Sequence, residues 1–407
     1  MDGLQLNDVL ARDPDLDPGF GNERGYFFPI PGETSDVRAV VLNTDESLNL
    51  AIALHNGKYQ FNRANADGFP IPDFQPTTAE FASNGTSVPT RLLRQPDNKI
   101  IMIGTFTNHA DSTLHRVSRP AVTRFNADGT PDPDFGHRVL PFTPEGVTTP
   151  LTPRKMADGC LQPDGKILIA SVYQRPDPNG SNVISRLTRL NSDGTPDTSF
   201  ANAGSVELIF DGATTDAANV QVQKSGKIVV AGWVVMNGQH QLTLARYTND
   251  GEPDMDFGKK GYARYIHPKH NAILKRLEVY DDKLVCAGFT TGPEHGALLM
   301  RFDADGHADP QFNDGEPVLT RDEFSVLQWA CISVQPNGDI IALGNDQNAN
   351  GKEFIIRRFT ERGQPDLSRQ WQTKPLTCSD VATQSSKRLI VTAKTRSGYS
   401  LVLGLLS

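Results

Sequence analysis

Short apolar segments recur along the chain, and each follows a turn signal. Typical copies are "KIIMIG" at 99–104, "KILIAS" at 166–171 and "KIVVAG" at 227–232. They are too short for helices and rich in β-branched residues, which is the pattern of strands buried on both faces. The preceding Pro-Asp-Gly, or a variant of it, predicts a tight turn. Each segment is therefore expected to be the second strand of a β-hairpin.

A second string follows each apolar segment and closes the unit. It reads "RFNADGTPDPDFG" at 124–136 and "RFDADGHADPQF" at 301–312. Its final Phe recurs 54 to 65 residues apart, at Phe20, Phe74, Phe135, Phe200, Phe257 and Phe312. A seventh copy, "RRFTERGQPDLSRQW", lacks this Phe. Self-similarity at a fixed period indicates a repeat architecture.

Within one unit the pattern predicts four strands. In the third copy they fall at about 156–162, 166–172, 184–190 and 205–210, with Asp-Gly turns after the first and third strands. Seven such units predict an all-β fold, namely a seven-bladed β-propeller. A solenoid of stacked repeats is the alternative, but it needs distinct capping repeats at its ends.

The two ends of the chain carry complementary parts of one unit. We expect a strand near Tyr26–Ile30 to lie outermost on the last blade, beside a strand near Ser400–Leu405, which closes the ring and protects two edges. The chain is then one domain, 1–407. Its parts are a leader (1–12), the closing strand of the last blade (13–32), blades one to six (33–377) and three strands of the last blade (378–407).

Residues 161–200 carry both signals in regular form, as "LQPDGKILIAS" and "LTRLNSDGTPDTSF". These strings resemble the delta-60 repeat family of bacterial proteins, whose unit runs approximately "qpDGKilvaG … laRlnpDGslDtsFG". The resemblance covers residues 13–405 and is weaker in the first and last blades. It implies a β-propeller, and it brings no shared catalytic signature.

The closing string also resembles a calcium-binding loop, because Asp303, Asp305 and Asp309 occupy the third, fifth and ninth positions, where such a loop has oxygen ligands. The first ligand position, however, is a cation in six copies: Arg63, Arg124, Arg189, Arg246, Arg301 and Arg358. We predict a bidentate ion pair in place of the metal. The carboxylate partners would be Asp132, Asp197, Asp254, Asp309 and Asp366.

Charge and composition narrow the partners. The 407 residues carry a net charge of −8 without a basic block, so no nucleic-acid partner is expected. The sequence has no apolar run long enough to cross a membrane, so membrane insertion is not expected. The acidic start "MDGLQLNDVLARDPDLDPGF" lacks the pattern of a secretory signal. We expect a protein that is cytoplasmic or exported without a standard signal peptide.

The four cysteines are widely spaced and are predicted to be reduced core residues: Cys160, Cys286, Cys331 and Cys378. Neither a metal nor a cofactor is expected.

The two faces of such a propeller should differ. One face would carry short, uniform Asp-Gly turns. The other would carry the dissimilar segments 75–88, 107–120, 142–156, 174–182 and 345–352. Binding residues concentrate on loops held by a rigid scaffold, so the face with the longer loops is the predicted working face.

Positions just after the second strand differ from blade to blade and should encircle the channel mouth. From them, and from Trp329 at the start of a first strand on the same face, we predict a ligand site of aromatic and polar groups with two residues at its rim. The site is Trp233, Phe289, Trp329, His55, Asn345 and Lys394, and the rim is Tyr173 and Arg175. The alternative is that the aromatic side chains pack between blades.

These features predict a non-catalytic binding or scaffolding module for a glycan or another protein. A hydrolase or lyase with a composite site on the same face is the alternative, although the sequence carries no G-x-S-x-G, H-E-x-x-H or P-loop motif. Two or more carboxylates or His side chains within hydrogen-bond reach in one pocket would favour catalysis, whereas aromatic and amide groups would favour binding.

Overall fold

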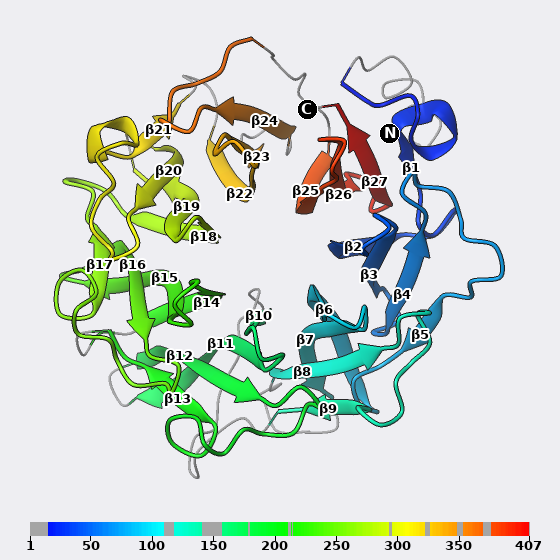
Figure 1. Cartoon of the computed structure of the whole chain (residues 1–407), viewed down its shortest axis with the longest axis horizontal. Coiled ribbons are helices and arrows are strands. Elements are labelled where there is room, and N and C mark those ends of the chain that lie inside the picture. The colour runs from blue at the N-terminus through cyan, green and yellow to red at the C-terminus, as the bar shows by residue number, and fades with distance from the viewer. Residues whose placement is uncertain are drawn as a thin grey trace.

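Seven antiparallel sheets form a ring, as predicted (Figure 1). The computed structural model describes residues 15–109, 118–140, 157–177, 180–210, 213, 215–292, 295–321, 326–347, 353–368 and 376–406. In this part of the chain six sheets have four strands and one has three. The only helical segments of the described residues are the short η1 (Gly21–Gly25) and η2 (Asn313–Gly315).

The first four blades run in chain order. Blade one comprises β2 (Ser35–Leu42), β3 (Leu48–Leu54), β4 (Tyr59–Ala64) and β5 (Thr77–Ala79). Blade two comprises β6 (Gly85–Arg94), β7 (Ile100–Asn108), β8 (Ser118–Phe125) and β9 (His137–Val139). Blade three comprises β10 (Ala157–Leu161), β11 (Ile167–Asp177), β12 (Gly180–Leu190) and β13 (Ser205–Leu208). Blade four comprises β14 (Thr215–Val222), β15 (Ile228–Met236), β16 (Gln239–Tyr247) and β17 (Tyr262–Tyr265).

The last three blades complete the ring. Blade five comprises β18 (Ala272–Tyr280), β19 (Lys283–Thr290), β20 (Gly296–Phe302) and β21 (Val318–Thr320). Blade six comprises β22 (Leu327–Val334), β23 (Ile340–Asp346) and β24 (Glu353–Phe359). Blade seven comprises β25 (Leu376–Thr383), β26 (Leu389–Thr395), β27 (Ser400–Leu405) and, from the amino-terminal segment, β1 (Tyr26–Phe27).

The closing strand lies where the sequence predicts it. Tyr26 pairs with Leu403 and Phe27 pairs with Val402, so β1 is the outermost strand of blade seven. Its regular part is two residues, shorter than the predicted stretch to Ile30. The backbone N–H of Asp17 extends the contact by donating to the carbonyl of Gly404 at 2.8 Å. Both ends of the chain therefore stabilise one sheet.

Blade three corrects one predicted loop. The segment 174–182 was expected to be a long loop, but β11 continues to Asp177 and β12 resumes at Gly180 in continuous antiparallel register. The predicted loops 107–120, 142–156 and 345–352 lie wholly or partly outside the described residues. In 75–88 the structure places β5 and the start of β6, so this segment is only partly a loop.

The core lies between neighbouring blades, and the closing Phe residues are part of it. Phe200 is fully buried, and its ring lies against Gly251 in the Asp-Gly turn of the next blade. A side chain at Gly251 would meet that ring at 2.9 Å, and its φ of +88° independently favours glycine. This turn must therefore keep its glycine for the two blades to pack closely.

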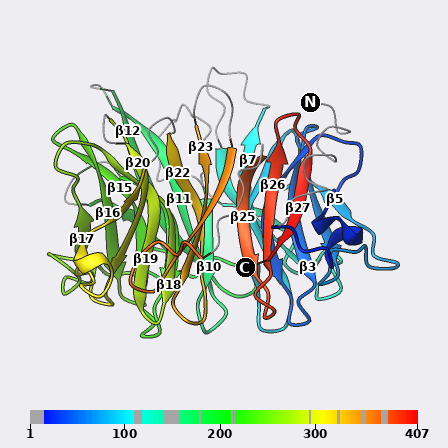
Figure 2. The same ribbon diagram turned by 90° about the horizontal axis from the view of Figure 1, so that it is seen from above.

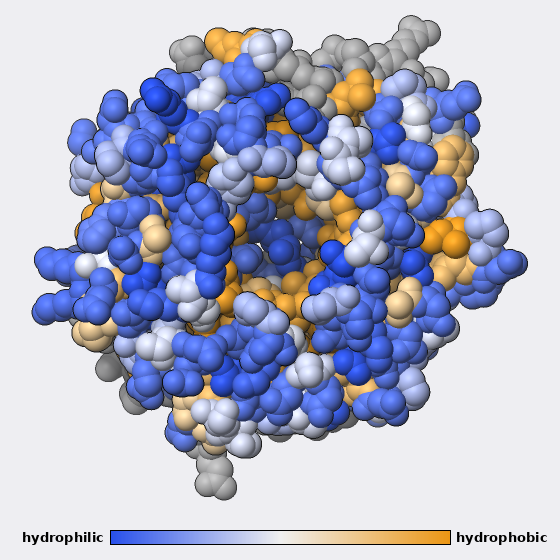
Figure 3. Space-filling view, in the orientation of Figure 1, coloured by the Kyte–Doolittle hydropathy of each residue, from blue (hydrophilic) through white to orange (hydrophobic). Residues whose placement is uncertain are grey.

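The two faces of the ring lie at its upper and lower edges when it is viewed edge-on (Figure 2). The face in Figure 3 is covered mainly by hydrophilic side chains and is hollowed at its centre. All four cysteines are buried and none forms a disulfide, as predicted. Among the described residues, none of the helices has the length and apolar character needed to cross a membrane.

Candidate binding site at the channel mouth

The closing string is held by an ion pair. Arg189 Nε lies 2.8 Å from Asp197 Oδ2, and both side chains are almost fully buried. Lys166 Nζ approaches the same oxygen at 3.0 Å. Burial alone would raise the pKa of Asp197, but its hydrogen bonds and the Arg189 charge outweigh burial and lower the pKa. The carboxylate is therefore charged and compensated within the protein.

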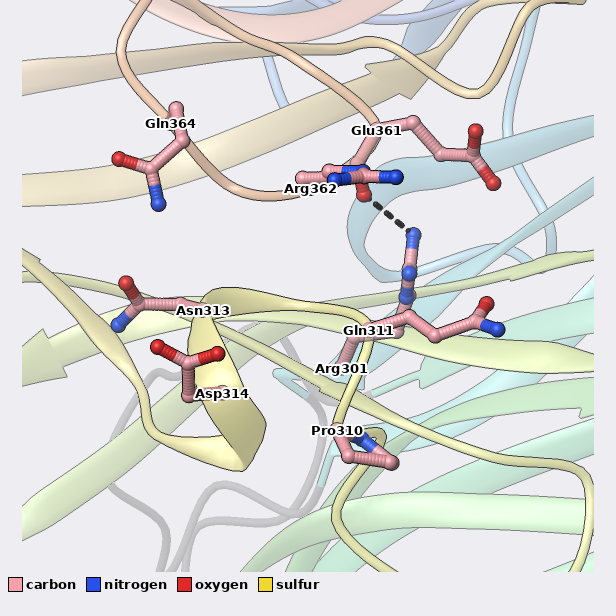
Figure 4. A pocket seen from close by; sticks show the side chains of 8 residues that line it. All are labelled: Arg301, Pro310, Gln311, Asn313, Asp314, Glu361, Arg362 and Gln364. Atoms are coloured by element: carbon pink, nitrogen blue, oxygen red, sulfur yellow. Dashed lines mark hydrogen bonds between the residues drawn. The ribbon is translucent and has the colours of Figure 1, made fainter.

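The same pair forms in three other blades, but with a different geometry from the predicted bidentate one. The Nε–Oδ2 distances are 2.8 Å for Arg124–Asp132, 2.7 Å for Arg246–Asp254 and 2.7 Å for Arg301–Asp309. Only Nε engages the carboxylate, because Nη1 donates to a backbone carbonyl of the next blade. Figure 4 shows this bond from Arg301 to Glu361, at 2.7 Å. The arginine therefore joins adjacent blades as well as its own string.

Two copies of the string depart from this pattern. Arg63 has no carboxylate partner at the equivalent place and donates to the carbonyl of Ala127 at 3.1 Å. Arg358 is 3.5 Å from Asp366 and closer, at 2.9 Å, to Asp339. No group of three His, Cys, Asp or Glu side chains suited to a metal ion occurs among the described residues.

The innermost strands carry a repeated irregularity. In six of the seven, β2, β6, β14, β18, β22 and β25, the register with the second strand shifts by one residue. A bulge leaves one residue unpaired and redirects its side chain. Five of the residues at these shifts line one cavity at the centre of the ring: Arg38, Thr90, Lys275, Ala330 and Ser379.

This cavity lies at the channel mouth on the face opposite the Asp-Gly turns, because most of its other lining residues come from the ends of second strands and the starts of first strands. Its volume is about 690 Å³, and its described lining comes from blades one, two, five, six and seven. Cavities of this size commonly hold small ligands. The bulges and the ring closure together create the site, since its walls come from both halves of the chain.

Cations outnumber carboxylates in the lining, with Arg38, Lys275, Arg276 and Lys394 against Asp36. Asp36 Oδ2 lies 2.8 Å from Arg38 Nη2 and 3.6 Å from Lys394 Nζ. Lys275 Nζ lies 5.5 Å from the centre of the Phe289 ring, a cation–π contact. The described lining of the cavity consequently carries more positive than negative groups.

A belt of charges, three of them buried, forms deeper in the channel. Arg91, Asp158, Arg276 and Asp380 occupy the same register position in four different blades. Arg276 Nη2 lies 2.8 Å from Asp380 Oδ1, and Arg91 approaches Asp158 at 3.6 Å and Asp380 at 3.7 Å. The two cations and two anions compensate one another across the channel, as buried charges require.

Glu278 lies next to this belt, two residues beyond Arg276 on β18. It accepts a hydrogen bond from the backbone N–H of Val334 at 3.1 Å. Burial raises its pKa against the opposing charge of Arg276. Sequence reasoning missed the belt and Glu278, although charged residues inside apolar first strands were a visible signal.

Two side chains of the cavity carry a polar atom without a hydrogen-bond partner among the described residues. Trp329 Nε1 is a donor, and Asn345 Oδ1 is an acceptor. Both side chains are more than nine-tenths buried and both line the cavity. Unsatisfied buried polar groups are costly, so a ligand or solvent that reached these two atoms would relieve that cost.

Three of the predicted ligand residues, Trp329, Asn345 and Lys394, lie together in the lining of this cavity. Phe289 is buried behind Lys275. The expected aromatic surface is wrong for Trp329, whose ring is 1% exposed and packs edge-on against Phe359. The cavity therefore presents charges, amides and hydroxyls in place of flat apolar rings.

The other predicted residues lie elsewhere. Trp233 is half-buried, stacks on His240 with ring centres 4.4 Å apart and does not line the cavity. His55 is exposed in the turn after β3, and register pairing puts Ala53 at the position expected for it. Tyr173 and Arg175 are on β11, but their side chains lie outside the described residues.

Known proteins share the repeat and the architecture. A family model described as "Domain of unknown function (DUF5122) beta-propeller" matches residues 95–135, 162–200 and 223–257. These stretches contain the apolar segment and the closing string of blades two, three and four. No curated protein matches the chain.

Solved structures are similar at the level of the fold. A PL25 ulvan lyase gives a TM-score of 0.55 at 12% identity, covering 93% of this chain and 95% of its own. Drosophila Semaphorin 1a, extracellular domains 1–2, gives 0.53 at 9% identity, covering 94% and 88%. The polysaccharide lyase Uly1 gives 0.51 at 10% identity, covering 91% and 90%. The chain is thus a seven-bladed β-propeller with repeats similar to those of the DUF5122 β-propeller family.

Proposed function

We propose that this protein is a non-catalytic binding module that holds a glycan or a protein segment in the channel-mouth cavity. The observation that carries the proposal is the pair of buried, unpartnered polar atoms, Trp329 Nε1 and Asn345 Oδ1, in one cavity of about 690 Å³. A preformed cavity with a few fixed polar groups is the usual form of a binding site. Its walls are β-strands of a closed ring, so little order is lost when a ligand binds.

The chemistry of the lining favours binding over catalysis. General acid–base chemistry on a glycosidic bond ordinarily uses two groups that exchange protons with the substrate. The described lining offers one carboxylate, Asp36, which is held by Arg38 and Lys394, and no histidine. Amides and hydroxyls such as Gln328 and Asn345 supply most of the remaining polar groups. These groups orient a ligand and do not transfer protons at neutral pH.

The alternative is a hydrolase or lyase with a composite site on the same face. Two of the similar structures are named as polysaccharide lyases, but identities of 12% and 10% carry the fold alone. The alternative makes a distinct prediction, since an enzyme would release products from a saccharide that it binds. A reducing-end or unsaturated-uronate assay on every bound glycan separates the two functions.

A ligand screen with a blocked cavity tests the proposal. The purified protein is applied to glycan and peptide arrays together with Ser379→Trp, which fills the cavity from a bulge position. The matched control is Ser225→Trp, the same change at an exposed turn residue of the opposite face. We expect a ligand that binds wild type and Ser225→Trp but not Ser379→Trp. Binding that is unaffected by Ser379→Trp, or turnover of the bound glycan, would overturn the proposal.

A further inference from the structure

The proposed site differs in charge from the protein around it. The chain carries a net charge of −8, yet the described lining of the cavity holds Arg38, Lys275 and Lys394 against one carboxylate, besides Arg276, which Asp380 compensates. Asp216 has the same register position as Asp36 but does not line the cavity. A concave site of one sign inside a protein of the other attracts ligands of opposite charge selectively.

Resting on the function proposed above, we propose that the ligand is an acidic saccharide, whose carboxylate or sulfate groups pair with Lys275 on one wall and with Arg38 and Lys394 on another. Blade five supplies Lys275, and blades one and seven supply the other two cations. Oxyanions accept strong, charge-assisted hydrogen bonds from ammonium and guanidinium groups. The site therefore recognises a ligand with more than one negative group.

Two of the wall cations share one carboxylate, since Arg38 and Lys394 lie 2.8 Å and 3.6 Å from Asp36 Oδ2. Lys275 stands at the bulge of β18, with its ammonium over the ring of the buried Phe289. Arg38 stands at the bulge of β2 and is 45% exposed at its side chain. Below them Arg276 is compensated by Asp380 of the belt. An anion in the cavity would therefore contact cations of the wall, while Arg276 below it is already neutralised by Asp380.

Hydroxyl groups make a saccharide the better match than an acidic peptide. The described lining includes Thr90, Thr105, Thr107, Ser118, Thr377 and Ser379. Thr107 Oγ1 and Ser118 Oγ are 2.5 Å apart, so this part of the wall is already ordered. Sugar hydroxyls can both donate to and accept from such groups. The only aromatic residue of the described lining is Trp329, whose ring is buried and offers no stacking surface.

Matched probes test the ligand class by isothermal titration of the full chain. They are trigalacturonate, neutral trigalactose, sodium sulfate and an acetylated tri-glutamate peptide. Lys275→Gln and Lys394→Gln each remove one wall cation. Lys224→Gln is the control, because Lys224 is 69% exposed on the opposite face and its pair with Asp281 is a surface pair.

We expect trigalacturonate to bind, trigalactose to bind at least tenfold more weakly, and each cavity variant to lose at least tenfold in affinity while Lys224→Gln loses none. Sulfate alone should compete, which identifies the anion as the anchoring group. Equal binding of trigalactose would overturn the requirement for acidic groups, and preference for the peptide would overturn the saccharide assignment. Neither result would overturn the binding site if Ser379→Trp still abolishes binding. If Ser379→Trp leaves every bound probe unaffected, the proposed function fails as well.

Discussion

Arg388 Nε of blade seven lies 2.5 Å from Asp17 Oδ2 of the amino-terminal segment. The register pairing puts Gly404 where the other blades have the arginine of the closing string, and Arg388 where they have its lysine. Arg388 therefore makes both contacts that the arginine and lysine make elsewhere. It pairs with Asp17, and its Nη1 donates to the carbonyl of Ala66 in blade one at 3.1 Å. The ring closes through the same kind of contact that joins its other blades.

The first prediction concerns this closing contact. Arg388→Ala should lower the free energy of unfolding by about 3 kcal/mol, because Asp17 is left mostly buried without its partner. Arg388→Lys should recover part of the loss, since lysine makes the equivalent contact in other blades. Urea unfolding measures both. Equal stability of Arg388→Ala and wild type would contradict a closing role.

The second prediction is that residues 1–32 are required for a monomeric, stable ring. Their deletion removes β1 and exposes the edge of β27, and it also removes Phe20, which is fully buried. We expect aggregation or a large fall in melting temperature, measured by light scattering and calorimetry. A truncated chain that stays monomeric with an unchanged melting temperature would contradict the closed ring.

The third prediction concerns the stability of the fold at low pH. Burial alone would raise the pKa of Asp132, but hydrogen bonds from Lys99 and Arg124 outweigh it and hold the pKa at about 2. The pKa of Asp132 is lower in the folded than in the unfolded protein, so its ionised form stabilises the fold above pH ~4. This contribution to the free energy of unfolding, on the order of 2 kcal/mol, is lost as the pH falls from about 4 to 2. Asp132→Asn should flatten the stability–pH curve in that window. An unchanged slope would contradict the prediction.

The fourth prediction is that the closing strings need no calcium. Arg189 Nε and Lys166 Nζ already compensate Asp197, so a cation would be repelled. A chelator should leave the melting curve unmoved. A shift of several degrees that calcium reverses would show that the strings bind metal.

The last substitution separates packing from recognition. Trp329→Ala should destabilise the protein by about 3–5 kcal/mol, because the ring is fully buried. Trp329→Phe should keep most of this packing and lose only the Nε1 donor, so it should weaken ligand binding with a smaller effect on unfolding. Identical affinity of Trp329→Phe and wild type would show that Nε1 does not contact the ligand.

The sequence predicted the fold well because the same local chemistry recurs in every blade. Asp-Gly turns and the closing Phe are short-range signals, and the split repeat at the ends indicated how the ring closes. The predicted position of His55 was wrong because the repeat pattern was aligned two residues out of register in blade one. The observed register puts Ala53 at the position expected for His55. Local pattern fixes a strand, but a divergent copy can leave its register open.

The site was only partly predictable. Asn345 and Lys394 could be placed near the cavity because they follow second strands, where blades differ; their role in binding stays a prediction. Lys275 and Arg38 were missed, since a bulge has no distinct residue signature and only the register shift turns these side chains to the cavity. The belt of charges depends on residues more than one hundred positions apart, such as Arg276 and Asp380, which meet only in the closed ring.

The most direct test of the central claim is a crystal structure of the protein with trigalacturonate. We predict density for the saccharide in the channel-mouth cavity, with carboxylate oxygens about 2.7–3.2 Å from Lys275 Nζ and Lys394 Nζ. Saccharide bound on the face of the Asp-Gly turns, with the cavity left to solvent, would contradict the account.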